Sequence, residues 1–158
     1  MAIDRADWHW ESAEKLYRET NGITGELTET QENDIWLLAA NHIGLFLRWV
    51  IENGFEGEGA DEQACEMVRE GRMTGAQYLM RYCDGKLWDE DIRSDILPFV
   101  TKYYDEQFFD DYGLSCGNED EELPCYSFIS GDDDYMRLRQ RIDAAYEKFI
   151  GGEPDGQA

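Results

Sequence analysis

The chain has 158 residues, of which 36 are Asp or Glu and 14 are Lys or Arg, and its formal net charge at pH 7 is −22. A hydrophobic fraction of 42% and an aromatic fraction of 13% are too high for a disordered chain, and the length suits one folded domain. A charge this negative repels phosphate and anionic lipid, which argues against nucleic-acid binding and membrane binding and favours a basic partner.

The first half of the chain predicts two helices. Residues 4–20 have the spacing of an amphipathic helix, which we expect Asp4 to cap and the following "NG" pair to end. A second helix is expected over residues 29–53, opened by a capping box at Thr28 and Gln31. Its apolar residues cover most of the helix circumference, which indicates the most buried element. We therefore expect the other helices to pack around it.

Shorter helices are predicted for the rest of the chain. Start signals and periodic apolar residues indicate helices over 61–70 and 74–83. Helical spacing also covers residues 88–106, where Pro98 lacks an amide donor and is expected to kink or restart the helix. The last helix is expected over residues 132–150.

Residues 107–130 do not continue the helical pattern. "CYSFIS", at 125–130, has a strand-like composition and can pair with "QFFDDYG", at 107–113, in a short two-stranded element. The sequence as a whole therefore predicts a mainly α fold. We expect a single-domain helical bundle over residues 1–150, built around one buried central helix, and a flexible tail over residues 151–158.

The N-terminal residues lack the basic start and the apolar run of a signal peptide, and no apolar run approaches a membrane span, so we expect a cytoplasmic protein. The four cysteines, Cys65, Cys83, Cys116 and Cys125, form no C-x-x-C pair and have no neighbouring histidine. We therefore expect reduced thiols and no zinc site. A disulfide between Cys116 and Cys125 in a secreted protein is the alternative.

Only two histidines are available for histidine-based chemistry. The positions that share a helical face with His9 carry no carboxylate, and Ala39 stands where a Glu-x-x-His metal motif ending at His42 needs glutamate. We expect a surface or packing role for His9 and a buried, hydrogen-bonded role for His42, with a functional role for either as the alternative. Nucleotide-binding, hydrolase and metalloprotease motifs are also absent, so we expect neither an enzyme nor a cofactor.

The segment between Lys102 and Arg137 contains eleven carboxylates, eight aromatic residues and no Lys or Arg. Carboxylates beside exposed aromatics supply the charge and the anchors that bind a basic protein. The alternative is a solvated acidic loop with inward-facing aromatics, in which residues 132–134 only cap the last helix. The predicted partner-binding residues are Asp105, Glu106, Phe108, Asp110, Asp111, Tyr112, Glu119, Asp120, Glu121, Glu122, Asp132, Asp133 and Asp134.

The runs "DWHWESAEKLYRETNGITGELTETQENDIWLLAANHIGLFLRWVIENGFEG" and "YLMRYCDGKLWDEDIRSDILPFVTKYYD" resemble a family of small acidic bacterial proteins known as a domain of unknown function. The resemblance extends over nearly the whole chain. It implies a bacterial cytoplasmic protein and carries over no active site. A small acidic single domain of this kind is similar to the immunity proteins that neutralise bacterial toxins.

The leading functional hypothesis is a non-enzymatic acidic protein that occludes a basic partner, such as a toxin nuclease or another nucleic-acid-binding protein. Its carboxylates would occupy a site built for phosphates. A nucleic-acid mimic of the anti-restriction or anti-CRISPR kind would bind its partner through the same attraction between carboxylates and a basic site. A carboxylate-based hydrolase is the alternative from another class, and a concave pocket with convergent carboxylates would favour it.

Overall fold

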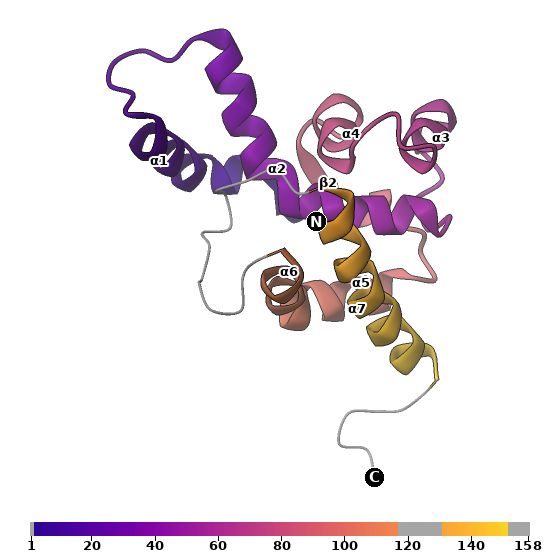
Figure 1. Ribbon diagram of the computed structural model, residues 1–158. Coiled ribbons are helices and arrows are strands. Elements are labelled where there is room, and N and C mark those ends of the chain that lie inside the picture. Colours follow the sequence, from indigo (N-terminus) through magenta and orange to yellow (C-terminus); the bar gives the residue numbers. More distant parts are fainter. Residues whose placement is uncertain (1, 117–130, 152–158) are drawn as a thin grey trace. The chain divides into compact units, whose positions relative to one another are not determined.

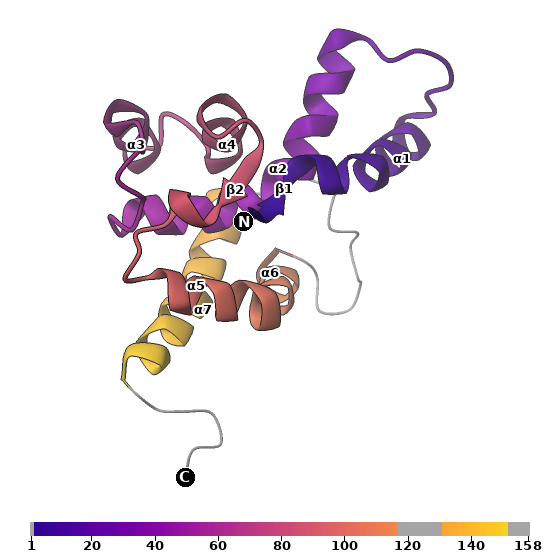
Figure 2. The same cartoon turned by 180° about the vertical axis from the view of Figure 1, so that it is seen from behind.

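The computed structural model describes residues 2–116 and 131–151. This part of the chain is mainly helical (Figure 1) and contains one two-stranded antiparallel sheet (Figure 2), so the mainly α prediction is confirmed. Among the described residues, the chain divides into a first unit, residues 2–93, and a second unit, residues 94–116 and 131–151. The expectation of a single domain over residues 1–150 with a flexible tail stays a prediction.

The long helix α2 (Glu29–Glu52) is the central element of the first unit. A capping box fixes its start: the Thr28 hydroxyl accepts the Gln31 N–H at 3.1 Å, and the Gln31 side chain accepts the Thr28 N–H at 2.9 Å. Every residue from 39 to 47 is buried, as the all-round apolar pattern predicts. The sequence therefore identifies both the start of this helix and its buried position.

Different helices pack against α2 along its length. The helix bends part-way, so that its first half lies beside α1 (Trp10–Asn21) and its second half beside α3 (Glu62–Arg69) and α4 (Gly75–Tyr82) (Figures 1 and 2). Ala13 of α1 and Ile35 of α2 belong to one buried apolar cluster. The helices of this unit thus pack around α2, as expected.

Among the described residues, α2 is also the one helix long and apolar enough to cross a membrane. In its most apolar window, 72% of the residues are buried inside the structure. The core helix of a folded protein meets the same test of length and composition, so this property is weak evidence for a membrane span.

The short helices α3 and α4 begin where the sequence predicts. The Asp61 carboxylate accepts the Ala64 N–H at 2.9 Å at the start of α3. Thr74 and Gln77 form a second capping box at the start of α4, with both bonds at 3.0 Å. These bonds satisfy backbone donors that have no partner within the helix. Both predicted helices are therefore confirmed.

The N-terminal residues form a strand and a turn of 3₁₀ helix before α1 begins. Strand β1 covers Ala2–Arg5, and the 3₁₀ turn η1 covers Ala6–His9. The helix predicted over 4–20 is therefore wrong at its N-terminal end, and Asp4 does not cap it. Its C-terminal end is confirmed, because Gly22 follows α1 in the left-handed conformation with φ 62°.

Pairing between β1 and β2 (Lys86–Trp88) explains this difference. Asp84 and Gly85 turn the chain into β2 with positive φ angles of 54° and 71°, and the Ala6 N–H donates to the Gly85 carbonyl at 2.8 Å. Within β1 the side chains alternate, and Asp4 is the inward one, 4% exposed. Pairing with a strand distant in sequence thus overrides the local helical pattern.

The backbones of α2 and α4 touch at Gly44 and Gly75. A Cβ added to Gly44 would overlap with the backbone of Ala76, and a Cβ added to Gly75 would overlap with the Gly44 carbonyl. A side chain at either position would force the two helices apart. The two glycines therefore set the separation of the helix pair with the most extensive contact in the unit.

The secondary-structure elements of the second unit among its described residues are all helical. They are α5 (Leu97–Tyr103), the π-helical segment η3 (Tyr104–Phe108), α6 (Phe109–Cys116) and α7 (Asp132–Ile150). α7 packs against α5 and α6, so the predicted last helix is confirmed. The buried residues of α7 lie along one stripe and are Tyr135, Leu138 and Ile142.

Two predictions for residues 88–113 are wrong in part. The first residues of the helix predicted over 88–106 end β2 and form the 3₁₀ turn η2 (Asp89–Asp91). Pro98 stands in the first turn of α5, where a missing N–H costs no helical bond, so it starts the helix. Residues 107–113 are helical rather than a strand. Their expected partner, residues 125–130, lies outside the described residues.

Replacing Gly44 with alanine is expected to lower the free energy of unfolding by about 2–3 kcal/mol, because the α4 backbone cannot yield as a flexible side chain would. Urea unfolding followed by far-ultraviolet circular dichroism measures the change. Gly59→Ala is the matched control, since no atom lies within 4 Å of a Cβ at that position. The control is expected to change stability by less than about 0.5 kcal/mol. Equal losses in the two variants would contradict the role of Gly44.

Candidate functional site

The acidic segment predicted to bind a partner occupies η3, α6 and the first turn of α7 among the described residues. Its side chains fall into three groups. Glu119, Asp120, Glu121 and Glu122 lie outside the described residues. Asp134 is half-buried, and Asp111 is buried. The exposed carboxylates are Asp105, Glu106, Asp110, Asp132 and Asp133.

Phe108 and Tyr112 are not the exposed anchors that the sequence predicts. Phe108 is 0% exposed and Tyr112 is 3% exposed. Their rings stack in a row with Tyr104, at centroid distances of 4.7 Å for Tyr104–Phe108 and 6.2 Å for Phe108–Tyr112. Helical residues four positions apart share a face, and this face points into the core. Phe108 and Tyr112 are therefore not part of the candidate partner-binding surface.

Asp111 also belongs to the packing of the second unit. Its Oδ2 accepts hydrogen bonds from the Tyr103 hydroxyl at 2.7 Å and from the Gln107 amide at 3.1 Å. Burial, together with the hydrogen bond to Asp111 and its charge, raises the pKa of Tyr103, so the phenol stays protonated and keeps donating. Asp111 is therefore not an exposed carboxylate, as the predicted partner-binding role requires, because its side chain is held inside the unit.

Phe109 and Leu114 are exposed instead, by 45% and 51%. Asp110 and Leu114 lie four residues apart on one helical face, and Phe109 and Glu106 lie within one turn of Asp110. We call Glu106, Phe109, Asp110 and Leu114 the α6 surface. It combines negative charge with two apolar side chains. Sequence reasoning missed Phe109 and Leu114, because consecutive aromatic residues do not reveal which ring faces outward.

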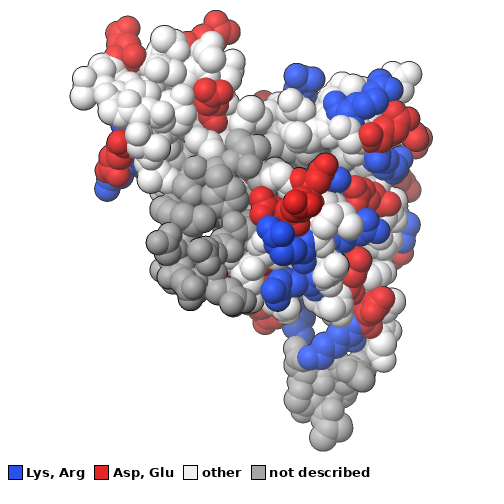
Figure 3. Space-filling view, in the orientation of Figure 1, with Lys and Arg blue, Asp and Glu red and all other residues white. Residues whose placement is uncertain are grey.

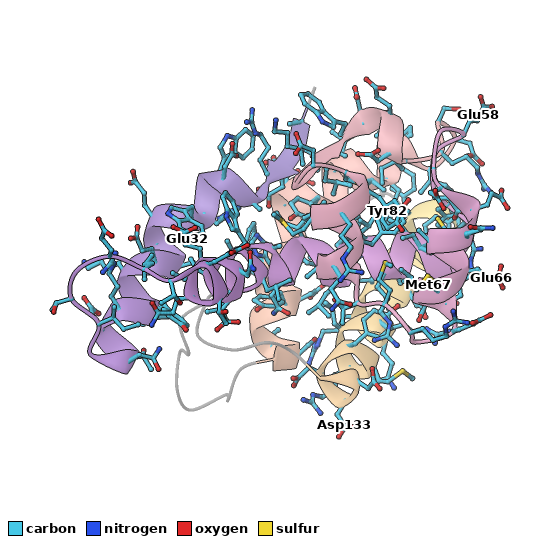
Figure 4. The ribbon with its side chains drawn as sticks, turned by 90° about the horizontal axis from the view of Figure 1, so that it is seen from above. Glu32, Glu58, Glu66, Met67, Tyr82 and Asp133 are labelled. Atoms are coloured by element: carbon cyan, nitrogen blue, oxygen red, sulfur yellow. The ribbon has the colours of Figure 1, made fainter. Side chains whose placement is uncertain are left out.

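The three aspartates at residues 132–134 stand in the first turn of α7, where the helix dipole favours carboxylates. Asp134 accepts the Gly131 N–H at 3.1 Å and pairs with Arg137. Asp133 projects away from its helix (Figure 4). On the face shown in Figure 3, Lys and Arg lie among the carboxylates. This turn fits the capping role that the sequence left as the alternative.

A second candidate site lies in the first unit, where Asp4 meets both histidines of the chain. Oδ1 of Asp4 lies 2.7 Å from Nε2 of His9, and Oδ2 lies 3.2 Å from Nε2 of His42. The two imidazole rings meet edge to face, with centroids 4.5 Å apart. The Arg5 N–H also donates to Oδ1 of Asp4 at 2.7 Å. The carboxylate is thus held between two rings and one backbone amide.

Three elements supply these residues: β1 carries Asp4, η1 carries His9 and α2 carries His42. Sequence reasoning compared each histidine only with neighbours on an assumed helix and therefore missed Asp4. One local signal for strand β2 was available in the sequence. An Asp-Gly turn is followed by "KLW", in which an apolar leucine follows a charged lysine, and this pattern indicates a strand that needs a partner. The sequence does not show that this partner is the N-terminal segment.

The surroundings of His42 favour the neutral imidazole. Burial lowers the pKa of His42, the hydrogen bond to Asp4 offsets part of this effect, and the nearby His9 lowers the pKa further. A neutral imidazole and a carboxylate are the forms in which these groups bind metal ions. One ligand atom from each of Asp4, His9 and His42 can be chosen so that all three lie within 4.8 Å of one another. The cluster therefore has the composition and size of a metal site.

Comparison with known protein families identifies the family to which the chain belongs. The model of a family described as a domain of unknown function, DUF7832, matches residues 2–127. The chain belongs to this family. The DUF7832 match includes Asp4, His9, His42 and the α6 surface and ends before α7. It confirms the resemblance to an uncharacterised family. Comparison with curated proteins gives no match, and comparison with solved structures gives none.

Stability is expected to fall with decreasing pH below about 6.5, the ordinary pKa of histidine, in part because of His42. The pKa of His42 is lower in the folded protein than in the unfolded chain, so the unfolded chain takes up the proton first. His42 therefore makes its full contribution to the free energy of unfolding above about pH 6.5, and this contribution is lost as the pH falls through the pKa of His42 in the folded protein.

Urea unfolding across this pH range, in a buffer that contains a chelator, measures the effect. His42→Gln is expected to have a weaker dependence of stability on pH than the wild type. Asn41→Ala is the matched control, because Asn41 is a buried polar neighbour that does not titrate. It should lose stability but keep the wild-type pH dependence. The prediction is wrong if His42→Gln keeps that dependence too.

Proposed function

We propose that this protein is a non-enzymatic binding protein that occludes a basic partner of the nucleic-acid-binding class, such as a toxin nuclease, in the bacterial cytoplasm. The observation that carries the proposal is the α6 surface, where Phe109 and Leu114 are exposed beside the carboxylates of Glu106 and Asp110. The protein would act by covering the surface that its partner uses for phosphates.

The charge of the chain supports a basic partner. The formal net charge is −22, and the segment between Lys102 and Arg137 has eleven carboxylates and no Lys or Arg. A protein that binds phosphates presents clustered Lys and Arg, and opposite charge accelerates its encounter with an acidic surface. The same charge would repel the nucleic acid that competes for this partner.

The apolar side chains of the α6 surface supply the contact that charge alone does not. Interfaces owe most of their affinity to a few residues, often aromatic, that become fully buried on binding. Phe109 is 45% exposed, although Tyr104 and Phe108 beside it are buried. Phe109 and Leu114 therefore have area left to bury against a partner, with acidic side chains beside them.

The charge part of the proposal can be tested with a partner captured from a lysate of the native host at low salt. The captured protein should be rich in Lys and Arg, and DNA should compete for it. Neutralising the α6 surface with Glu106→Gln and Asp110→Asn is expected to slow association roughly tenfold at low salt. Glu58→Gln with Glu62→Gln is the matched control, because it removes the same charge from exposed positions of the first unit.

The anchor part needs a separate pair of variants. Phe109→Ala with Leu114→Ala is expected to accelerate dissociation by roughly 30-fold or more, because anchor residues act mainly on the lifetime of a complex. Met136→Ala is the control, since Met136 is 46% exposed in the same unit but lies outside the α6 surface. The proposal fails if no basic protein is captured, or if the control variants weaken binding as much as the α6 variants.

A further inference from the structure

We propose that Asp4, His9 and His42 form a binding site for a Zn²⁺ ion. The donor set is two imidazole nitrogens and one carboxylate oxygen, which is the composition of zinc sites that keep a position open for water or a ligand. Imidazole also disfavours Mg²⁺ and Ca²⁺, which prefer sites made only of oxygen. Exposed carboxylates elsewhere on this acidic chain offer only oxygen atoms, so they do not favour Zn²⁺ over Mg²⁺ and Ca²⁺.

The distances within the cluster are close to those of a zinc site. The three candidate ligand atoms lie within 4.8 Å of one another. Zinc bonds of about 2.0–2.1 Å place tetrahedral ligands roughly 3.3 Å apart, so no pair of atoms has to close by more than about 1.5 Å. The Nε2 atoms of both histidines already point at the same carboxylate, one at each oxygen. Small side-chain rotations would therefore admit the ion.

The protein assembles these donors before any ion arrives. Asp4 is held by strand pairing and by the Arg5 N–H at 2.7 Å, and His42 is fixed in the buried part of α2. A neighbour that orients a metal ligand raises the affinity of the site, and the Arg5 amide is placed to do this for Asp4. The donors come from β1, η1 and α2, so zinc would also join the N-terminal segment to the central helix.

His9 provides the side from which an ion can enter. Its side chain is 16% exposed, whereas those of His42 and Asp4 are 0% and 5% exposed. A water molecule in the fourth position would lie on this accessible side. A neutral imidazole binds zinc through a ring nitrogen that carries no proton, so binding through Nε2 requires the Nδ1–H tautomer in each ring.

Binding of Zn²⁺ to the chelator-stripped full chain tests this inference. Calorimetry is expected to show one tight site for each chain, and a thousandfold excess of Mg²⁺ should not displace the ion. His9→Ala and Asp4→Asn are each expected to weaken binding by roughly 100-fold or more. Asp7→Asn is the matched control, because Asp7 is an exposed carboxylate two residues from His9. It should leave the affinity unchanged.

Nuclear magnetic resonance of the wild type tests the site without any substitution, so the result does not depend on whether a variant folds. The chain has only two histidines, so both sets of imidazole signals should shift on addition of one equivalent of Zn²⁺, with the Nδ1–H tautomer in both rings. Several weak sites that Mg²⁺ displaces, or histidine signals that do not move, would overturn the proposal. The α6 surface plays no part in this experiment, so a failure here is distinguishable from a failure of the proposed function.

Discussion

The first unit depends on the contact between the backbones of α2 and α4 at Gly44 and Gly75. This contact fixes the rotation of α2 about its own axis as well as its distance from α4. Successive helical residues are rotated by about 100°, so His42 lies roughly 200° from Gly44, on the opposite side of the helix. With Gly44 against α4, His42 faces the N-terminal segment that carries Asp4 and His9. One point of close packing therefore orients the side chain that joins this segment to the core.

Carboxylates have opposite roles in different parts of the chain. Asp4 and Asp111 are 4% and 7% exposed, and each is held by two other side chains, because an unpaired buried charge is costly. Glu106 and Asp110 are exposed and add little to stability, but they can attract a partner over a distance. The carboxylates that give the chain its large negative charge thus do not form one uniform surface. Part of it holds the fold together, and part of it faces the solvent.

Local chemistry made much of the fold predictable, and contacts between distant residues made the rest unpredictable. The starts of α2, α3 and α4 depend on capping groups within three residues of the helix end, so the sequence shows them directly. The cluster of Asp4 with two histidines depends on strand pairing between β1 and β2. The exposure of Phe109 beside the buried Phe108 depends on which face of this helical stretch meets the core, and two consecutive aromatic residues do not show this.

The division of the chain into two units has an optical consequence. The chain has five tryptophans, and all of them, Trp8, Trp10, Trp36, Trp49 and Trp88, belong to the first unit. Trp49 is 0% exposed and Trp8 is 59% exposed, so the emission of this unit combines a buried and a solvated indole. Tryptophan fluorescence therefore reports the loss of the first unit alone, whereas backbone signals report both units. Coincidence of the two transitions would identify a single cooperative folding unit.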